Sequence, residues 1–242
     1  MNILIVNDDG IHAEGIFELA RLAKRLGNVT VCAPMQQCSG KAHGITVVDR
    51  MLVRRETDFP VPGVTAYSVD GTPADAAMAG LCGILKEKPD FVFSGINDGY
   101  NTGIDALYSG TVGAAMEGLV HGVRAVAFSL GAGAAGFDLI DAYFDELVRY
   151  VLEHPCGRNE IYNLNFPACA PENLRGILYD CIPSEQEFYD IYNYTVEPAT
   201  RTTFYLKCAP AAPVRGPEGT DMDAVLQNYI AVGKLKNMVI GE

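Results

Sequence analysis

The sequence predicts an α/β protein with a mainly parallel sheet and a C-terminal β-hairpin. An apolar run over residues 2–6 stops abruptly at a polar loop, as a buried strand does. Apolar side chains over residues 16–26 then recur at helical spacing and stop at Gly27, which predicts a crossover helix. From Gly176 onward the pattern changes to short, Tyr-rich extended pieces, which predict a hairpin arm.

Length and composition limit the classes of protein that this chain can be. The 242 residues, 49% of them apolar, suffice for one large core with an appendage, and we expect a catalytic core over residues 1–175 and an extension over residues 176–242. A net charge of −12 disfavours a nucleic-acid partner. Seven scattered cysteines without C-x-x-C spacing predict reduced thiols in a cytoplasm. There is no leader-like segment and no apolar run near the ~20 residues that span a bilayer, so no membrane association is expected.

The remaining elements follow from local patterns. Further strands are expected over residues 29–33, 45–53, 65–69, 91–94, 124–130 and 161–164, with a connection over 54–63. Helices are expected over residues 72–85, from 110 onward, and over 137–153 and 221–226. The C-terminal extended pieces are expected over residues 177–182, 188–196, 202–208 and 229–232. An aromatic face of the hairpin is expected to pack on another subunit, or alternatively on its own body; its members are Phe188, Tyr192, Tyr194 and Phe204.

Two adjacent carboxylates, Asp8 and Asp9, follow the first predicted strand. The carboxyl ends of parallel strands enclose the ligand crevice in this class of fold. Adjacent carboxylates repel each other unless a cation lies between them, so the pair indicates a metal site. The alternative is structural, because Asp8 can cap the next helix and Asp9 can occupy a turn before Gly10.

Two further loops bring oxygen donors to the same edge. Ser39 lies in the polar loop after the second predicted strand, and Asn97 follows the strand over residues 91–94. Together with Asp8 and Asp9 these oxygen ligands favour Mg²⁺, Mn²⁺ or Ca²⁺ over zinc.

The segment from Ser109 predicts an anion site at the start of a helix. Ser109 is the expected N-cap, and the free N–H groups of Gly110 and Thr111 would receive a phosphate with the help of the helix dipole. The alternative is a helix whose small residues serve only close packing.

A literal G-x-G-x-x-G string occupies residues 131–136, but a flexible loop is the favoured interpretation. The string is not in the first strand-to-helix turn, and the next predicted strand ends in Asn165 instead of an acid that would hold a ribose.

Ordered motifs along nearly the whole chain resemble the SurE survival proteins, a family of metal-dependent 5′(3′)-nucleotidases, some of which also cleave short polyphosphate. The matching segments are Asn7-Asp8-Asp9-Gly10, Ser39-Gly40, Ile45-Thr46, Gly71-Thr72-Pro73-Ala74-Asp75, Ser94-Gly95-Ile96-Asn97, Asn101, Tyr108-Ser109-Gly110-Thr111-Val112-Gly113-Ala114-Ala115 and Asn163-Leu164-Asn165-Phe166-Pro167. The pattern departs from the family in the loop over residues 41–44, near Phe204 and at residues 233–235.

The resemblance implies a fold, a site and partners. The implied fold is a Rossmann-like three-layer core with a C-terminal β-hairpin extension that forms homodimers or homotetramers. One divalent cation per subunit, Mn²⁺ or Mg²⁺, would be held by the metal ligands Asp8, Asp9, Ser39 and Asn97. The phosphate of a nucleoside monophosphate would be received by Asn101, Ser109, Gly110 and Thr111.

The expected chemistry is attack by metal-activated water, oriented or deprotonated by Asp8. A covalent aspartyl-phosphate is the rival mechanism, but the Asp-x-Asp spacing of the phosphatases that use one is absent. His43 is a candidate proton donor or phosphate contact, although exposed loop histidines are usually idle. A non-catalytic nucleotide-binding protein and a purely structural oligomer remain the alternative classes.

Overall fold

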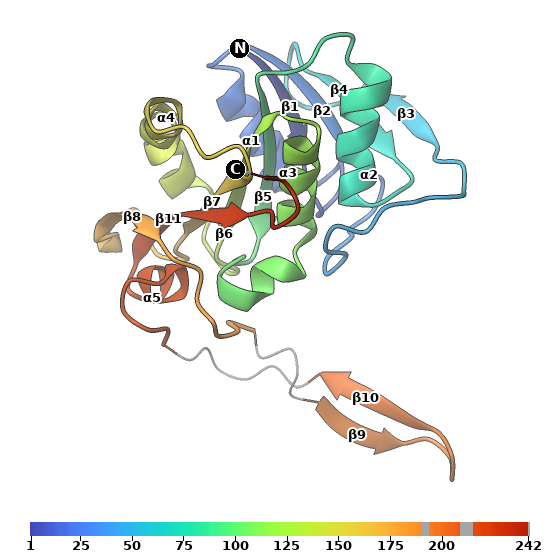
Figure 1. Cartoon of the computed structure of the whole chain (residues 1–242), viewed down its shortest axis with the longest axis vertical. Helices are drawn as coiled ribbons and strands as arrows, with labels where there is room; N and C mark the ends of the chain where they lie inside the picture. The colour runs from blue at the N-terminus through green and yellow to red at the C-terminus, as the bar shows by residue number, and fades with distance from the viewer. Residues whose placement is uncertain (190–193, 209–214, 242) are drawn as a thin grey trace.

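The computed structural model describes residues 1–189, 194–208 and 215–241 (Figure 1). The strands are β1 (Asn2–Val6), β2 (Asn28–Pro34), β3 (Val53–Glu56), β4 (Thr65–Val69), β5 (Phe91–Asp98), β6 (Arg124–Leu130), β7 (Glu160–Phe166), β8 (Gly176–Cys181), β9 (Tyr194–Pro198), β10 (Phe204–Cys208) and β11 (Tyr229–Lys236). The α-helices are α1 (Glu14–Ala23), α2 (Pro73–Met78), α3 (Gly110–Val120), α4 (Asp138–Glu153) and α5 (Asp221–Leu226). A π-helix, Ala79–Ile84, continues α2, and 3₁₀ turns cover Gly103–Leu107 and Pro171–Asn173.

One mixed sheet organises the molecule. Within the described residues it has nine strands in the order β3-β4-β2-β1-β5-β6-β7-β11-β8. The six central strands from β4 to β7 pair in parallel, whereas β3 and β11 pair antiparallel to β4 and β7. The predicted α/β class with a mainly parallel sheet and a C-terminal hairpin is therefore confirmed.

Each face of the sheet buries its own core. Apolar residues of α1 and α4 pack on one face, and those of α2 and α3 pack on the other. The first of these cores contains Phe93, Phe128 and Phe144, whose rings meet edge to face or tilted at centroid distances of 5.3 to 6.2 Å. Burial on both faces explains why the central strands read as continuous apolar runs.

Local sequence signals explain where the helices on the second face begin. Thr72 accepts a hydrogen bond from the Asp75 amide while the Asp75 carboxylate accepts one from the Thr72 amide, which is a capping box, and Pro73 occupies the first helical position. Ser109 caps α3 in the same way by accepting from the Val112 amide at 3.1 Å.

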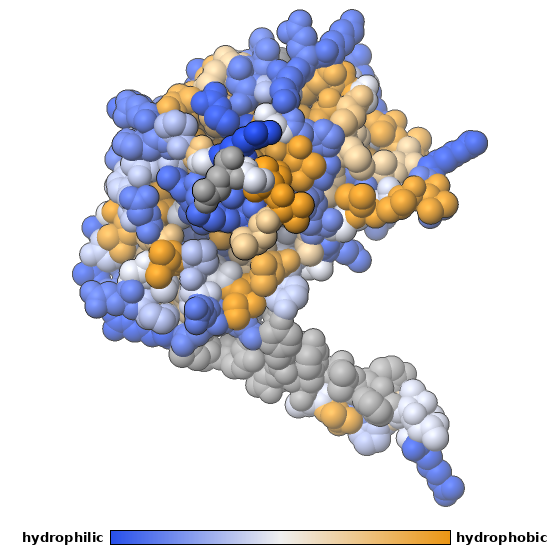
Figure 2. Space-filling view, in the orientation of Figure 1, coloured by the Kyte–Doolittle hydropathy of each residue, from blue (hydrophilic) through white to orange (hydrophobic). Residues whose placement is uncertain are grey.

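The predicted strand over residues 45–53 is wrong, because pairing begins only at Val53 and continues through Glu56 into the segment predicted as a connection. The side chains of Val47 and Val48 are 82% and 91% exposed, so β-propensity alone did not bring this segment to the sheet. Its projection beside β3 forms an apolar protrusion on the surface (Figures 1 and 2).

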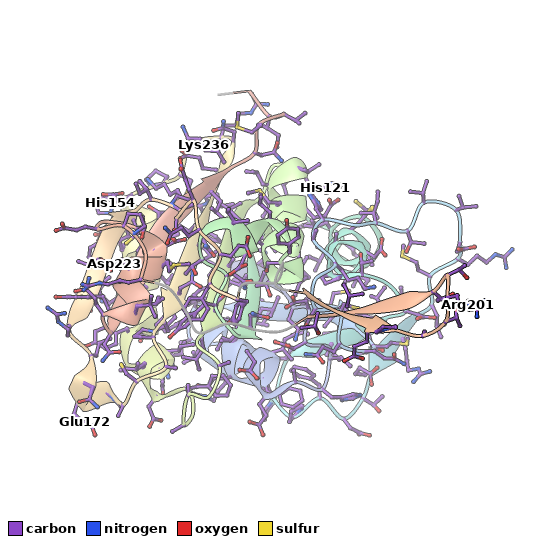
Figure 3. All side chains as sticks on the ribbon, turned by 90° about the horizontal axis from the view of Figure 1, so that it is seen from below. His121, His154, Glu172, Arg201, Asp223 and Lys236 are labelled. Carbon is purple, nitrogen blue, oxygen red and sulfur yellow. The ribbon has the colours of Figure 1, made fainter. Side chains whose placement is uncertain are left out.

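The C-terminal region contributes both to the sheet and to a ribbon. β8 and β11 extend the large sheet beyond β7, whereas β9 and β10 form an antiparallel ribbon that projects from the body, with Arg201 near its tip (Figures 1 and 3). The division of the chain at residue 175 stays a prediction. Among the described residues, no helix combines the length and apolar character needed to cross a bilayer.

Of the predicted aromatic face of the hairpin, the structure describes only the side chain of Phe188. Phe188 packs on its own chain, with its ring centroid 4.8 Å from that of Tyr100. Tyr192 and the side chains of Tyr194 and Phe204 lie outside the described residues, so their packing on another subunit stays a prediction.

Candidate active site

The carboxyl ends of β1 and β5 border a crevice. These strands are neighbours, but α1, which follows β1, and α3, which follows β5, pack on opposite faces of the sheet. Chains that leave adjacent parallel strands toward opposite faces create the ligand crevice of this class of fold. The sequence places Asp8, Asp9 and Asn97 at this point.

Asp8 is buried against the start of α3. Its side chain is 3% exposed, and its carboxylate accepts a hydrogen bond from the hydroxyl of Thr111. Burial raises the pKa of Asp8 to about 6, with a smaller contribution from the charge of Asp9, and the Thr111 hydrogen bond opposes the rise. Asp8 can therefore take up or release a proton near neutral pH.

Gly110 makes the approach of Asp8 to α3 possible. A Cβ at position 110 would lie 2.8 Å from the Cβ of Asp8 and 2.9 Å from Cγ of Pro73. Any side chain here would displace the carboxylate, so the helix must begin with glycine at this point.

Asp9 is held on the other side of the chain. Its carboxylate accepts hydrogen bonds from the backbone amide of Asp98 at 3.1 Å and from the side chain of Gln37 at 3.4 Å. Burial raises the pKa of Asp9, and these hydrogen bonds oppose the rise. Two adjacent carboxylates with raised pKa values form a site where bound positive charge is favoured.

The structure brings most of the predicted site residues to one cavity. A cavity of 280 Å³ is lined by Asp8, Ser39, Asn97, Asn101 and Ser109, together with residues of the same loops. Asp9 lines an adjoining cavity that shares Asn97 and Asp98 with the first. Gly110 and Thr111 are buried behind Asp8 and do not line the cavity.

The loop that carries Ser39 is fixed at both ends. The amide of Cys38 donates to the carbonyl of Asp8 at 2.7 Å, and the amide of Ala42 donates to the carbonyl of Tyr108 at 3.0 Å. A Cβ at Gly113 would lie 2.1 Å from the carbonyl oxygen of Ala42, so glycine at this position lets the loop rest on α3.

His43 completes the attachment of this loop. Its Nε2 lies 2.7 Å from a carboxylate oxygen of Glu117 in α3, whose other oxygen lies 3.0 Å from Nε2 of His121 at the end of the helix. The hydrogen bond with His43 is the largest cause that lowers the pKa of Glu117, burial opposes it, and His121 adds to the lowering. His43 therefore contacts α3 and does not line the 280 Å³ cavity.

Asn101 rests on a buried amide network. Its amide donates to the side-chain oxygen of Asn165 at 2.8 Å, its carbonyl accepts from the side chain of Asn163 at 2.8 Å, and its own side-chain nitrogen donates to the hydroxyl of Ser129 at 2.7 Å. These partners come from the ends of β6 and β7, so the network fixes the loop after β5 to the neighbouring strands.

Tyr189 is a residue at the cavity that sequence reasoning did not find. Its hydroxyl accepts a hydrogen bond from the amide of Tyr100 at 2.7 Å, and a Cβ at Gly99 would lie 2.8 Å from that hydroxyl. The amides of Phe188 and Tyr189 donate to the carboxylate of Asp105, which fixes this segment to the 3₁₀ turn Gly103–Leu107. Tyr189 falls within the extended piece expected over residues 188–196, but nothing in that pattern indicates that the segment reaches the cavity.

The donor set fits a hard divalent cation. Asp8, Asp9, Ser39 and Asn97 offer only oxygen ligands if Asn97, whose amide nitrogen donates to the carbonyl of Gly99 at 2.9 Å, presents its oxygen. Two of these ligands are carboxylates, and no group of three or more His, Cys, Asp or Glu suited to a metal occurs among the described residues.

The fold and the crevice define a parallel α/β protein with two adjacent carboxylates after β1, one of which, Asp8, faces the N-terminus of α3. The family model described as Survival protein SurE matches residues 3–186, and the chain belongs to this family.

Relatives and a solved structure agree over nearly the full length. The chain is 36% identical to the 5′-nucleotidase SurE of Methylobacterium sp. strain 4-46, with 98% of this chain and 93% of the relative covered. It is 37% identical to that of Methylococcus capsulatus, with 98% and 91% covered. The crystal structure of the SurE protein from Aquifex aeolicus is similar with a TM-score of 0.84 and 34% identity, and covers 100% of this chain and 95% of its own.

Proposed function

We propose that this chain is a 5′-nucleotidase that hydrolyses nucleoside monophosphates with the help of one divalent cation per subunit. The observation that carries the proposal is the placement of Asp8 between Asp9 and the start of α3, buried, bound by Thr111 and with its pKa raised to about 6. The names of the relatives, 5′-nucleotidase SurE, support the reaction class.

Asp8, Asp9, Ser39 and Asn97 would hold the cation, with Mn²⁺ or Mg²⁺ as the expected ion. When bound, such an ion neutralises charge on a phosphate oxygen and lowers the pKa of a coordinated water. The raised pKa values of both aspartates in the metal-free chain support this assignment, because a bound cation would offset the cost of burying two negative charges.

Phosphate binding and proton transfer would be carried out by residues of the chain. Ser109 and Asn101 line the phosphate cavity, whereas Gly110 and Thr111 lie behind Asp8, so the start of α3 would favour the phosphate through the helix dipole and through the position of Asp8. As the water oxygen bonds to phosphorus, the P–O bond to the nucleoside breaks and the departing oxygen takes up a proton from solvent. Asp8 accepts the proton of the attacking water, and the Thr111 hydroxyl keeps the carboxylate in position.

Release of inorganic phosphate tests the proposal. Wild-type protein is assayed on a panel of 5′- and 3′-mononucleotides and short polyphosphate with Mn²⁺, Mg²⁺ or EDTA. Release with metal, none with EDTA and a loss of at least ~100-fold in Asp8→Asn are expected. Nucleotide binding without any hydrolysis would favour the non-catalytic alternative.

We also propose that the β9–β10 ribbon joins subunits into a homodimer or homotetramer. A two-stranded ribbon is marginally stable alone in water, and this one projects from the body (Figure 1). Deletion of residues 194–208 should reduce the mass measured by light scattering to that of a monomer.

A further inference from the structure

The crevice continues past the carboxylates into a second, larger cavity. This cavity measures 640 Å³ and lies on the face of the sheet that carries α1 and α4. Its walls come from the end of β5, the start of α1 and the loop between β6 and α4. That loop is the G-x-G-x-x-G string over residues 131–136, which the proposed hydrolysis does not use.

Asn97 and Asp98 line both cavities, so the two cavities are neighbours. The smaller one, 280 Å³, suffices for a phosphate and a cation but falls below the ~300–1,000 Å³ of sites that enclose larger organic ligands. The larger one lies within that range. A nucleoside monophosphate therefore needs space beyond the phosphate cavity, and the 640 Å³ cavity adjoins it.

We propose that the 640 Å³ cavity binds the nucleoside part of the substrate, with its ribose hydroxyls facing Asp98 and Glu14 and its base lying on the glycine-rich loop and Phe137. This inference rests on the proposed function, in which the glycine-rich loop over residues 131–136 has no role. The ligand expected in the cavity is a neutral group that carries hydroxyls and a flat ring.

The charge of the cavity supports this ligand class. Asp9, Glu14 and Asp98 line it, and none of the described lining residues is Lys or Arg. Carboxylates accept hydrogen bonds from hydroxyl groups but repel anions, so the cavity suits a nucleoside and disfavours a polyphosphate chain.

The glycine-rich loop supplies the flat wall. A Cβ built at Gly133 or Gly136 meets no atom within 4 Å, so the backbone at both positions borders open space. Without side chains there, a base can approach the backbone closely and reach its N–H and C=O groups. Phe137 is half-buried at the end of the loop, where it packs against the core and contributes an aromatic side chain to the lining of the cavity.

Another cavity, of 600 Å³, competes for the nucleoside. It adjoins the phosphate cavity at Ser109 and extends along the outer side of α3, with Leu107 and Met116 in its walls. The hydroxyl of Ser109 is already bound to the Val112 amide, and only one residue is shared with the phosphate cavity. The 640 Å³ cavity shares two residues and combines hydroxyl acceptors with an aromatic side chain, so we favour it.

Filling each cavity with tryptophan separates the possibilities. Ala135→Trp fills the proposed cavity from an exposed position, Leu107→Trp fills the rival one, and Ala170→Trp is a matched exposed control that lines neither. kcat/KM is measured with Mn²⁺ for AMP and for glycerol 2-phosphate, which lacks a base. We expect Ala135→Trp to lower the ratio of kcat/KM for AMP to kcat/KM for glycerol 2-phosphate at least tenfold. The other two variants should leave this ratio within twofold of the wild-type value. An unchanged ratio in Ala135→Trp, or a selective loss in Leu107→Trp, overturns the proposal.

Binding of adenosine in EDTA gives a readout that does not depend on catalysis. Wild-type protein is titrated by isothermal calorimetry, and Ala135→Trp is expected to weaken the affinity at least tenfold while Ala170→Trp does not. Equal affinity in Ala135→Trp and wild type overturns the proposal. If wild type hydrolyses neither ester, the proposed function fails, and the adenosine titration still decides whether the cavity binds a nucleoside.

Discussion

Gly110 and Asp8 are in direct contact, since a Cβ at position 110 would lie 3.0 Å from Oδ2 of Asp8 and closer still to its Cβ. Gly110→Ala therefore has to move the carboxylate relative to Asp9 and Thr111. Small displacements of a reacting group are costly, so we expect kcat/KM for AMP to fall by about tenfold or more. Steady-state phosphate release measures the loss.

Gly118→Ala is the matched control in the same helix. Its Cβ would lie 2.8 Å from a methyl group of Val92 in the core, away from the crevice. We expect a loss of about 1–3 kcal/mol in the free energy of unfolding with kcat/KM preserved. If Gly110→Ala keeps wild-type kcat/KM, the contact with Asp8 does not matter for the reaction.

Asp8→Asn should stabilise the metal-free protein while it abolishes activity. Burial disfavours the charge of Asp8 and raises its pKa from 3.8 to about 6, whereas an Asn oxygen can still accept from Thr111. This rise in the pKa of Asp8 corresponds to a decrease of about 3 kcal/mol in the free energy of unfolding once the carboxylate is ionised. Urea unfolding in EDTA at neutral pH measures the gain, and the exposed control Asp58→Asn should change stability by less than about 0.5 kcal/mol.

The same carboxylate predicts a pH dependence. Because the folded state binds the proton of Asp8 more tightly than the unfolded state, its stabilising contribution is complete below pH 3.8 and is lost as pH rises through about 6. The difference in free energy of unfolding between Asp8→Asn and wild type, measured in EDTA, should therefore grow across this interval and then level off. A difference that is independent of pH would contradict the raised pKa.

Glu117 is expected to hold the Ser39 loop through His43. Glu117→Gln removes the charge at the hydrogen bond of 2.7 Å and keeps the size of the side chain. Hydrogen bonds to charged groups contribute about 1.5–3 kcal/mol and neutral ones about 0.5–1.5 kcal/mol, so the substitution should weaken the contact by about 1–1.5 kcal/mol and make local opening of the loop about tenfold more frequent. Hydrogen exchange at the Ala42 amide, which donates to the carbonyl of Tyr108, reports this opening.

His121→Ala tests whether this effect is specific to the loop. It removes the other partner of Glu117, at 3.0 Å, and leaves the contact with His43 intact. Exchange at Ala42 should stay near the wild-type rate in His121→Ala and rise in His43→Ala. Equal rates in the two variants would mean that the loop does not depend on His43.

Much of the architecture could be predicted because local signals and tertiary structure agree. The apolar runs of β1, β5 and β6 are buried on both faces, and the capping signals of Thr72 and Ser109 mark the true helix starts. The segment over residues 45–52 shows the limit of this reasoning. Its β-branched residues suggest a strand, but pairing with β4 begins only at Val53. Where a strand begins depends on which residues of the partner strand are available for pairing, and the sequence of the segment alone does not contain this information.

The candidate active site could likewise be predicted only in part from the sequence. That Asp8, Ser39 and Asn97 meet could be predicted from strand ends, because parallel strands deliver their loops to one edge. The attachment of His43 to Glu117 could not be predicted, since the two lie 74 residues apart and no periodicity relates them. The same holds for Tyr189, which reaches the cavity from an irregular segment.

The amide network beneath the cavity gives a last prediction. Asn165 accepts from the amide of Asn101 at 2.8 Å and donates to its carbonyl at 3.3 Å. Asn165→Asp keeps the acceptor but places a carboxylate oxygen against that carbonyl, in a buried position where repulsion is not screened. A lost buried hydrogen bond costs about 1–3 kcal/mol, so we expect that decrease in the free energy of unfolding and a lower kcat/KM as Asn101 shifts. Because the new carboxyl can regain the donor when it is protonated, stability relative to wild type should recover as pH falls; a deficit that persists at acid pH would place the damage elsewhere than in this contact.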